Sequence, residues 1–218
     1  MARSVNPTRE DELLQNAIRL FSRGGFQETS LEEIARELGI TRPLFYYYFE
    51  SKEDLLWRII GHLGDSLLEQ AGPIAAAAEV PAERLRQIIE KHIKTLLDNI
   101  DAFRVYFAER HLLTGSKDLR IKRGELRYHN LVAAIISEGQ QLNQFRAGDP
   151  HFLTRLSMGT ANAPLRWYRP SGSMSPQETV DGITDFILAG LAPELGNSAE
   201  PLRSLGPAAH AQQSGPGS

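Results

Sequence analysis

Cysteine is absent from the 218-residue chain, which excludes a disulfide scaffold, a thiolate metal site and a cysteine nucleophile. No apolar run approaches the roughly 18 residues that a membrane-spanning helix needs. The first ten residues, MARSVNPTRE, lack the apolar core of a signal peptide. These absences predict a cytoplasmic protein that does not associate with a membrane.

Motifs of metal binding and catalysis are also lacking. The six histidines are scattered along the chain, and none forms a close His-x3-His pair backed by a carboxylate, as metal sites favour. The chain has no Gly-x-Ser-x-Gly motif, no Walker loop and no glycine-rich dinucleotide turn. The sequence therefore predicts no metal, no cofactor and no enzymatic activity.

Positive charge is scarce for a protein that could bind nucleic acid. The net charge is −3, and residues 1–58 hold eight Lys or Arg against ten Asp or Glu. A domain that bound DNA by bulk electrostatics would be basic. Any DNA binding must depend on a few placed cations, on helix N-termini and on hydroxyls. We therefore expect DNA binding to vary only weakly with salt concentration.

Helical periodicity is what the chain does have. Apolar residues, 41% of the total, recur at helical spacing, and no strand-like alternation of useful length is found. We expect an all-α fold of about nine helices. Residues 1–50 should form a three-helix domain and residues 51–192 a larger helical domain. Residues 193–218, rich in Gly, Pro, Ser, Ala and Gln, should be a disordered tail.

Two prolines should shape the helices of the second domain. The helix that begins near Ser51 is expected to run to about Ala71, before the pair Gly72-Pro73. Another helix is expected over residues 151–168, and Pro164 should kink or interrupt it.

The most informative stretch is SLEEIARELGITRPLFYYYFESK, residues 30–52. Ser30, followed by a glutamate three residues later, fits a capping box at a helix start. Gly39 suits the left-handed conformation that closes a helix. Thr41 can cap a second helix, with Pro43 in its first turn. A helix, a short glycine-containing turn and a second helix make a helix-turn-helix, whose second helix enters the DNA major groove.

The second helix of this motif has two distinct faces. Helical spacing turns three aromatic side chains towards the core: Phe45, Tyr48 and Phe49. It leaves outward a set that suits DNA, joined by a lysine of the next helix: Arg42, Pro43, Leu44, Tyr46, Tyr47 and Lys52. Arginine can fork to a guanine edge, while proline and leucine can pack against thymine methyls. Tyrosine and lysine can bond to phosphates. The alternative is a two-helix corner of an ordinary helical protein with tyrosines at its surface.

The segment from Thr8 to about Trp57 resembles the N-terminal DNA-binding domain of the TetR family of transcriptional regulators. The matching residues are LLQNAIRLFSRGGFQETSLEEIARELGI and TRPLFYYYFESKEDLL. The resemblance implies a set of positions that face bases: Thr41, Arg42, Pro43 and Leu44. It implies a second set that holds the phosphate backbone: Tyr46, Tyr47 and Lys52, with a further phosphate contact from Thr29 or Ser30.

The last two helices carry small residues beside branched aliphatic ones. Such faces permit close helix approach, and a self-complementary surface makes a twofold dimer. Packing within one chain is the alternative. A dimer is also what a pair of recognition helices needs, since two half-sites lie about one helical turn, 34–36 Å, apart. The resemblance to TetR proteins likewise implies that a homodimer forms through the last two helices.

Residues 166–170, RWYRP, place two arginines around two aromatics. They could cap a ligand pocket, the guanidinium binding phosphate or carboxylate and the indole stacking. The alternative is a helix end buried under Trp167 with solvated arginines. With MSPQETVDGITDFILAGL after it, this run resembles the C-terminal region of TetR-type repressors of steroid-ring degradation, which implies an acyl-CoA or related thioester as effector. The expected pocket lining is Phe103, Tyr106, Phe107, Tyr128, Arg166 and Trp167.

Together these features predict a homodimeric, ligand-responsive TetR-like transcriptional regulator. We expect it to act as a repressor that binds a palindromic double-stranded DNA operator and is released by a small-molecule effector. Two alternatives belong to other classes. A helical protein-interaction adaptor would use the exposed tyrosines for a protein partner. An enzyme acting on a phosphorylated small molecule would need an acid or base that the sequence does not offer.

Overall fold

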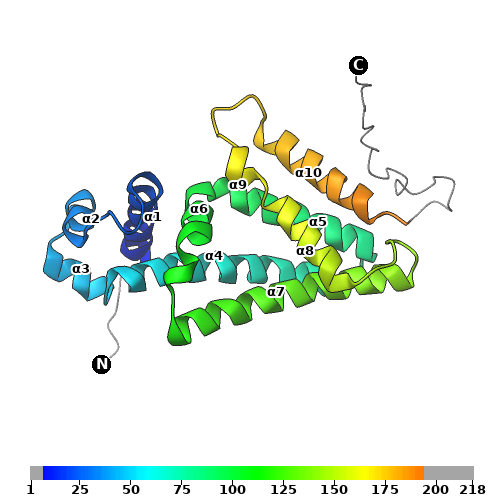
Figure 1. Cartoon of the computed structure of the whole chain (residues 1–218), viewed down its shortest axis with the longest axis horizontal. Helices are drawn as coiled ribbons and strands as arrows, with labels where there is room; N and C mark the ends of the chain where they lie inside the picture. Colours follow the sequence, from blue (N-terminus) through cyan, green and yellow to red (C-terminus); the bar gives the residue numbers. More distant parts are fainter. Residues whose placement is uncertain (1–6, 194–218) are drawn as a thin grey trace, which may run out of the picture.

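A computed structural model describes residues 7–193, and within that range every regular element is a helix (Figure 1). The all-α prediction is confirmed. The predicted tail, residues 193–218, lies outside the described residues except for its first position. The helices are α1 (Pro7–Gly24), α2 (Leu31–Glu37), α3 (Arg42–Tyr48), α4 (Lys52–Ala75), α5 (Pro81–Asp98), α6 (Ile100–Glu109), a 3-10 turn (Arg110–Leu112), α7 (Gly115–Gln141), α8 (Pro150–Ala161), α9 (Pro164–Trp167) and α10 (Pro176–Leu191).

The two prolines act differently from one another. Pro164 interrupts the predicted helix as expected: α8 ends at Ala161, and the four-residue α9 begins at the proline. Pro73 does not end α4, which continues to Ala75. That expectation was wrong because a proline so near a helix end removes only one bond. The amide of Ala76 still donates to the carbonyl of Gly72, at 3.1 Å.

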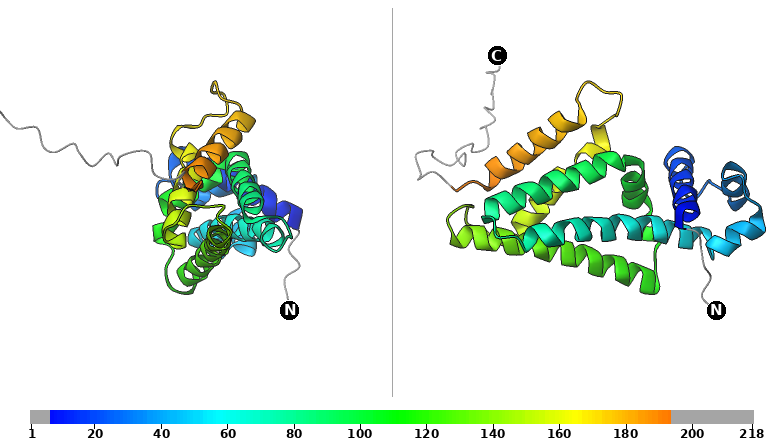
Figure 2. Two further views of the ribbon diagram at one scale, coloured as in Figure 1. Left: turned by 90° about the vertical axis from the view of Figure 1, so that its right-hand side faces the viewer. Right: turned by 180° about the vertical axis from the view of Figure 1, so that it is seen from behind.

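The molecule is elongated, and α4 runs between its two parts. Helices α1, α2 and α3 gather at one end, and α4 leaves them to lie alongside α7 (Figure 1). Helix α5 packs against α4, α7 and α10, while α8 packs against α7 and α10. The views from the side and from behind show the same arrangement (Figure 2). Helix α4 is therefore shared between the two parts, and α1 also touches α6.

One apolar core extends through both parts. Phe21, Phe26 and Ile34 are buried among α1–α3, and Leu55 and Ile59 carry the same core along α4. Because the core does not stop at the helix-turn-helix, a shift of α4 would be felt at both ends of the molecule. Within the described range, we find no helix with both the length and the apolar character to cross a membrane.

Candidate nucleic-acid interface and ligand cavity

The helix-turn-helix is built by local bonds at its caps. Ser30 caps α2, and its Oγ accepts from the amide of Glu33 at 3.1 Å. Gly39 has φ +61°, the left-handed conformation that a turn out of a helix requires. Thr41 then caps α3, its Oγ1 accepting from the amide of Leu44 at 3.4 Å. The predicted start of each helix and the predicted end of the first are thus confirmed.

Helix α3 is divided sharply between core and solvent. Phe45 and Phe49 are fully buried, whereas Leu44, Tyr46 and Tyr47 are 40%, 41% and 39% exposed. Three large exposed side chains on one seven-residue helix form a cluster, and such a cluster indicates a binding surface. Arg42 and Pro43 are exposed beside them. This face, residues 42–44, 46 and 47, is hereafter the α3 face.

Arg42 at the start of α3 is held by neighbours in the free protein. Its Nη1 lies 2.7 Å from Oε1 of Glu32 on α2, with both side chains well exposed. Its guanidinium carbon lies 6.0 Å from the centre of the Tyr46 ring. The hydrogen bond with Tyr46, together with the Glu32 carboxylate, raises the pKa of Arg42. The guanidinium therefore stays charged, and a DNA ligand would compete with Glu32 for it.

Two of the predicted phosphate ligands have other partners. The Lys52 ammonium donates to the carbonyls of Phe26, Gln27 and Thr29, at 2.7, 3.3 and 3.0 Å. An ammonium has three hydrogens, and all are used here. Thr29 is 3% exposed, and its hydroxyl donates to the Gly25 carbonyl at 2.7 Å. In the free protein both side chains hold the turn between α1 and α2, and their phosphate contacts stay predictions. Ser30 remains exposed.

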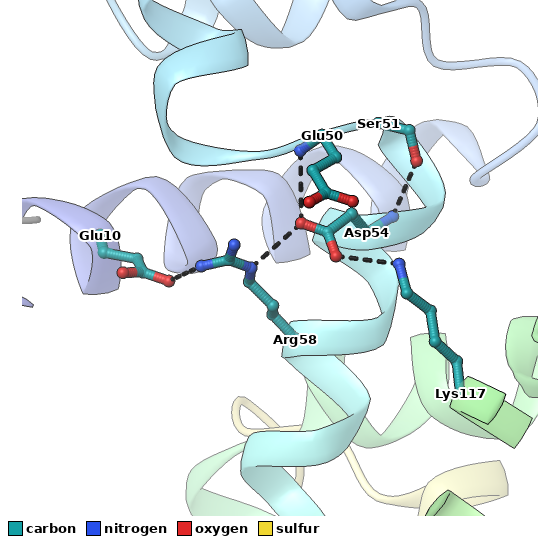
Figure 3. Close-up of polar contacts among 6 residues, drawn as sticks. All are labelled: Glu10, Glu50, Ser51, Asp54, Arg58 and Lys117. Atoms are coloured by element: carbon teal, nitrogen blue, oxygen red, sulfur yellow. Dashed lines mark hydrogen bonds and ion pairs between the residues drawn. The ribbon is translucent and has the colours of Figure 1, made fainter. Parts of the chain in front are cut away.

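A buried carboxylate joins the two parts of the molecule. Asp54, in the first turn of α4, is 4% exposed. Its Oδ1 accepts from the ammonium of Lys117 on α7 at 2.9 Å. Its Oδ2 accepts from Nε of Arg58 at 3.2 Å and from the amide of Glu50 at 3.3 Å. Figure 3 shows these bonds, with Arg58 reaching on to Glu10 of α1. Asp54 thus links α1, α4 and α7.

The pKa of Asp54 reflects opposing influences. Burial would raise it, but the bond from Lys117, the charge of Arg58 and the Glu50 amide together lower the pKa of Asp54 below its ordinary value. The carboxylate is therefore ionised near neutral pH, and the link between the parts is an ion pair.

A cavity of about 560 Å³ opens between α4, α6, α7 and α8, a volume typical of small-molecule sites. Its lining includes four of the six residues predicted for a pocket: Phe103, Tyr106, Phe107 and Tyr128. Gly61 and Gly64 of α4 also border it, and a Cβ at either would meet no atom within 4 Å. These glycines widen the cavity and do not serve close helix packing.

Arg166 and Trp167 do not reach this cavity. They line a separate surface hollow, where Nη2 of Arg104 donates to the Tyr168 carbonyl at 2.9 Å. Trp167 is 46% exposed, and Tyr168 is the buried aromatic. The break at Pro164 turns α9 towards α6, so Arg166 and Trp167 lie apart from the other four residues predicted for the pocket.

Cations stand at the rim of the cavity. Arg120 and Lys122 of α7 and Arg155 of α8 line it, and all three are exposed. Arg120 pairs with Asp65 of α4 at 3.2 Å across the opening. Sequence periodicity did not indicate that Arg155, on another helix, would share the rim of the cavity with Arg120 and Lys122 of α7. Lys122 pairs with Asp118 at 2.7 Å. An anionic group at this opening would therefore meet three cations, two of which already have carboxylate partners.

The cavity wall also holds a carboxylate that is already neutralised. Arg110 donates to Glu125 through Nε and Nη2 at 2.6 and 2.7 Å, and the Tyr106 hydroxyl donates to the same group. Burial and this carboxylate raise the pKa of Tyr106, which stays protonated. Burial lowers the pKa of His129, one turn along α7; the charge of Glu125 opposes this shift, whereas Arg155 and His151 add to it. The charge of Glu125 is balanced locally by Arg110, with which it forms an ion pair.

Helices α8 and α10 present large apolar side chains to solvent. Phe152 and Leu156 of α8 are 56% and 53% exposed, and Phe186 of α10 is 70% exposed. The two helices pack against each other, and these three exposed residues are hereafter called the α8–α10 face. In the part of the chain that the structure describes, no group of three His, Cys, Asp or Glu side chains is placed to hold a metal ion.

Comparison with known proteins covers both parts of the chain. Residues 13–59 match the family described as bacterial regulatory proteins, tetR family, and residues 78–191 match the tetracyclin repressor-like C-terminal domain. The chain is 26% identical over 186 residues to the HTH-type transcriptional repressor KstR2 of Rhodococcus jostii, which covers 84% of this chain and 91% of that protein.

Solved structures agree with these matches. A TetR/AcrR-family regulator from Thermobifida fusca is similar with a TM-score of 0.68 and 33% identity, over 84% of this chain and 98% of that one. AibR, solved in complex with isovaleryl coenzyme A and operator DNA, has a TM-score of 0.73 at 24% identity, over 82% of this chain and 97% of that one. The second likeness concerns the fold.

Proposed function

The chain belongs to the TetR family of transcriptional regulators, and from this premise we propose that it is a repressor released from its operator by a small-molecule effector. The matched families and relatives are transcriptional regulators and not enzymes. The observation that carries the proposal is the position of α4, whose first turn holds the helix-turn-helix and whose middle borders the cavity.

We propose that the α3 face reads the operator. Arg42, Pro43 and Leu44 would contact base edges, with the Thr41 backbone beside them. Tyr46 and Tyr47 would bond to phosphates, and the exposed Ser30 at the α2 N-terminus would add one more such contact. Lys52 and Thr29 would support this surface from behind. The division of labour would place DNA binding in residues 1–50 and effector binding in residues 51–192.

We propose that the α8–α10 face is covered by a second copy of the chain. Phe152, Leu156 and Phe186 are large apolar side chains left exposed on two helices that pack together, and exposed apolar side chains of this kind suit an interface. A twofold pair would bring two α3 faces to adjacent turns of a palindromic operator.

We propose that the effector is an acyl-CoA or related thioester. The rim cations Arg120, Lys122 and Arg155 suit the phosphates of coenzyme A, and apolar residues such as Leu63, Phe103 and Met158 suit an acyl group. The isovaleryl coenzyme A bound by AibR supports this class. Release requires that the effector bind the DNA-free form more tightly than the DNA-bound form.

Fluorescence anisotropy on DNA from upstream of the protein's own gene tests the proposal. We expect saturable binding of two chains per palindromic site, and reversal by octanoyl-CoA but not by octanoate or by coenzyme A alone. Absence of binding to that DNA would contradict the operator assignment. Binding that no acyl-CoA reverses, together with no heat from any thioester in calorimetry, would remove the effector class and leave the DNA-binding role in place.

A further inference from the structure

The deep wall of the cavity carries three polar side chains from three helices. His92 of α5 is 5% exposed and lies between Tyr128 of α7 and Asn162 at the end of α8. Its Nδ1 is 3.1 Å from the Tyr128 hydroxyl, and its Nε2 is 3.0 Å from Oδ1 of Asn162. All three residues line the cavity. The surrounding wall is apolar, with Phe103 and Met158 beside them.

The direction of these bonds follows from the chemistry of the groups. The amide oxygen of Asn162 can only accept, so Nε2 of His92 carries the proton and donates to it. Burial lowers the pKa of His92, so the ring is neutral and Nδ1 is an acceptor. The Tyr128 hydroxyl must then donate to Nδ1. Burial raises the pKa of Tyr128, which keeps that proton in place.

These bonds use both ring nitrogens of His92 and the amide oxygen of Asn162, but not the amide nitrogen of Asn162. Both nitrogens of His92 are satisfied, so the ring serves to hold its two neighbours. The amide nitrogen of Asn162 takes no part in the contact with His92 and remains a donor at the cavity wall. A ligand that filled the cavity with hydrocarbon alone would cut this donor off from water. A buried donor left without an acceptor is costly, and such sites reject analogues that lack the matching group.

We propose that Asn162 selects effectors whose apolar portion carries a carbonyl oxygen, which accepts a hydrogen bond from the amide nitrogen of Asn162. His92 and Tyr128 are positioning residues that fix the asparagine. The inference deepens the proposed effector site and rests on it. The effector would then need two features: an anionic group that binds at the rim, and a carbonyl oxygen within its apolar portion.

Calorimetry with the full-length protein tests this with two thioesters of equal chain length, octanoyl-CoA and 7-oxooctanoyl-CoA. The oxo compound should bind at least about tenfold more tightly, the scale set by a buried donor that is left without its acceptor. In Asn162→Leu this preference should vanish while octanoyl-CoA binding is retained. Asn130→Leu is the matched control, because Asn130 is an exposed asparagine at the cavity opening, and it should keep the preference.

A second variant guards against misfolding. Asn162→Asp is isosteric and keeps an oxygen towards His92, but it replaces the donor with an acceptor. It should also lose the preference for the oxo compound. Equal affinities in the parent protein, or a preference that persists in both Asn162 variants, would overturn the proposal.

Failure of the coenzyme A assignment can be told apart from failure of this inference. A pair without the head group, 4-phenyl-2-butanone and butylbenzene, probes the wall alone by ligand-observed NMR. If neither thioester binds but the ketone is preferred over the hydrocarbon through Asn162, the effector class fails and the carbonyl site stands. If the ketone is bound no better than butylbenzene, the carbonyl site fails.

Discussion

The Lys117 ammonium lies 2.9 Å from Oδ1 of Asp54, and this pair ties the first turn of α7 to the first turn of α4. The lysine also lies 5.2 Å from the centre of the Trp57 ring. Helix α7 forms the rim and part of the wall of the cavity, so any shift of its N-terminal turn acts directly on the helix that carries α3.

Replacing Lys117 with glutamine should destabilise the fold. The buried Asp54 carboxylate would keep Arg58 but lose the second of its two charged partners, at a cost of about 1–3 kcal/mol. Urea unfolding at one fixed protein concentration measures the change. Lys94→Gln, an exposed lysine on α5, is the control and should change stability by less than about 0.5 kcal/mol. Equal effects of the two substitutions would contradict the importance of the pair.

The cost of Lys117→Gln should depend on pH. Because the folded protein lowers the pKa of Asp54, the carboxylate contributes stability above the ordinary Asp pKa of about 3.9 and loses it as pH falls through the lower folded value. Protonated Asp54 no longer pairs, so the difference between parent and variant should shrink in acid. Urea unfolding from about pH 7 to about pH 3 checks the trend. A difference that grew in acid would refute it.

Glu32→Gln should tighten DNA binding by freeing Arg42. The exposed pair with Glu32 is weak, so we expect about a twofold to fivefold gain in affinity, from the usual worth of such pairs. Glu37→Gln removes the same charge from the same helix and is the control. An equal gain in both variants would show that net charge, and not release of Arg42, is responsible. Anisotropy on the operator fragment measures both.

Lys52→Gln should weaken the fold without altering the salt dependence of DNA binding. Three carbonyls would lose their donor, and we expect a loss of about 1–3 kcal/mol. A phosphate contact would instead reduce the slope of log affinity against log salt by about 1. Unfolding and operator titrations at several salt concentrations separate these outcomes. A reduced slope of log affinity against log salt, with unchanged stability, would show that Lys52 contacts a DNA phosphate.

Phe186→Asp should convert the protein to monomers. A carboxylate in the α8–α10 face would have to lose its water on pairing. Sedimentation velocity measures the state, and operator affinity should fall with it because one α3 face binds one half-site. Leu119→Asp is the control, since Leu119 is 53% exposed on α7, away from that face. If Phe186→Asp remained a dimer, the dimer interface would have to lie outside the α8–α10 face.

Local bonds made the helix-turn-helix predictable. The caps of Ser30 and Thr41 and the left-handed Gly39 involve atoms within three residues, and a linear pattern of residue types can express such bonds. The two faces of α3 follow from helical periodicity in the same way. The bonds of the Lys52 ammonium could not be predicted in this way, because its carbonyl partners lie 23 to 26 positions earlier in the chain.

The sequence was enough to predict the helices, the family and the residues of the α3 face. Which residues share the cavity depended on how the helices pack: Arg166 and Trp167 lie outside it, while His92 and Asn162, 70 positions apart, meet inside it. A helical period shows which side of a helix is apolar but not which distant helix covers it. That choice is made by packing, when α5, α7 and α8 close against α4.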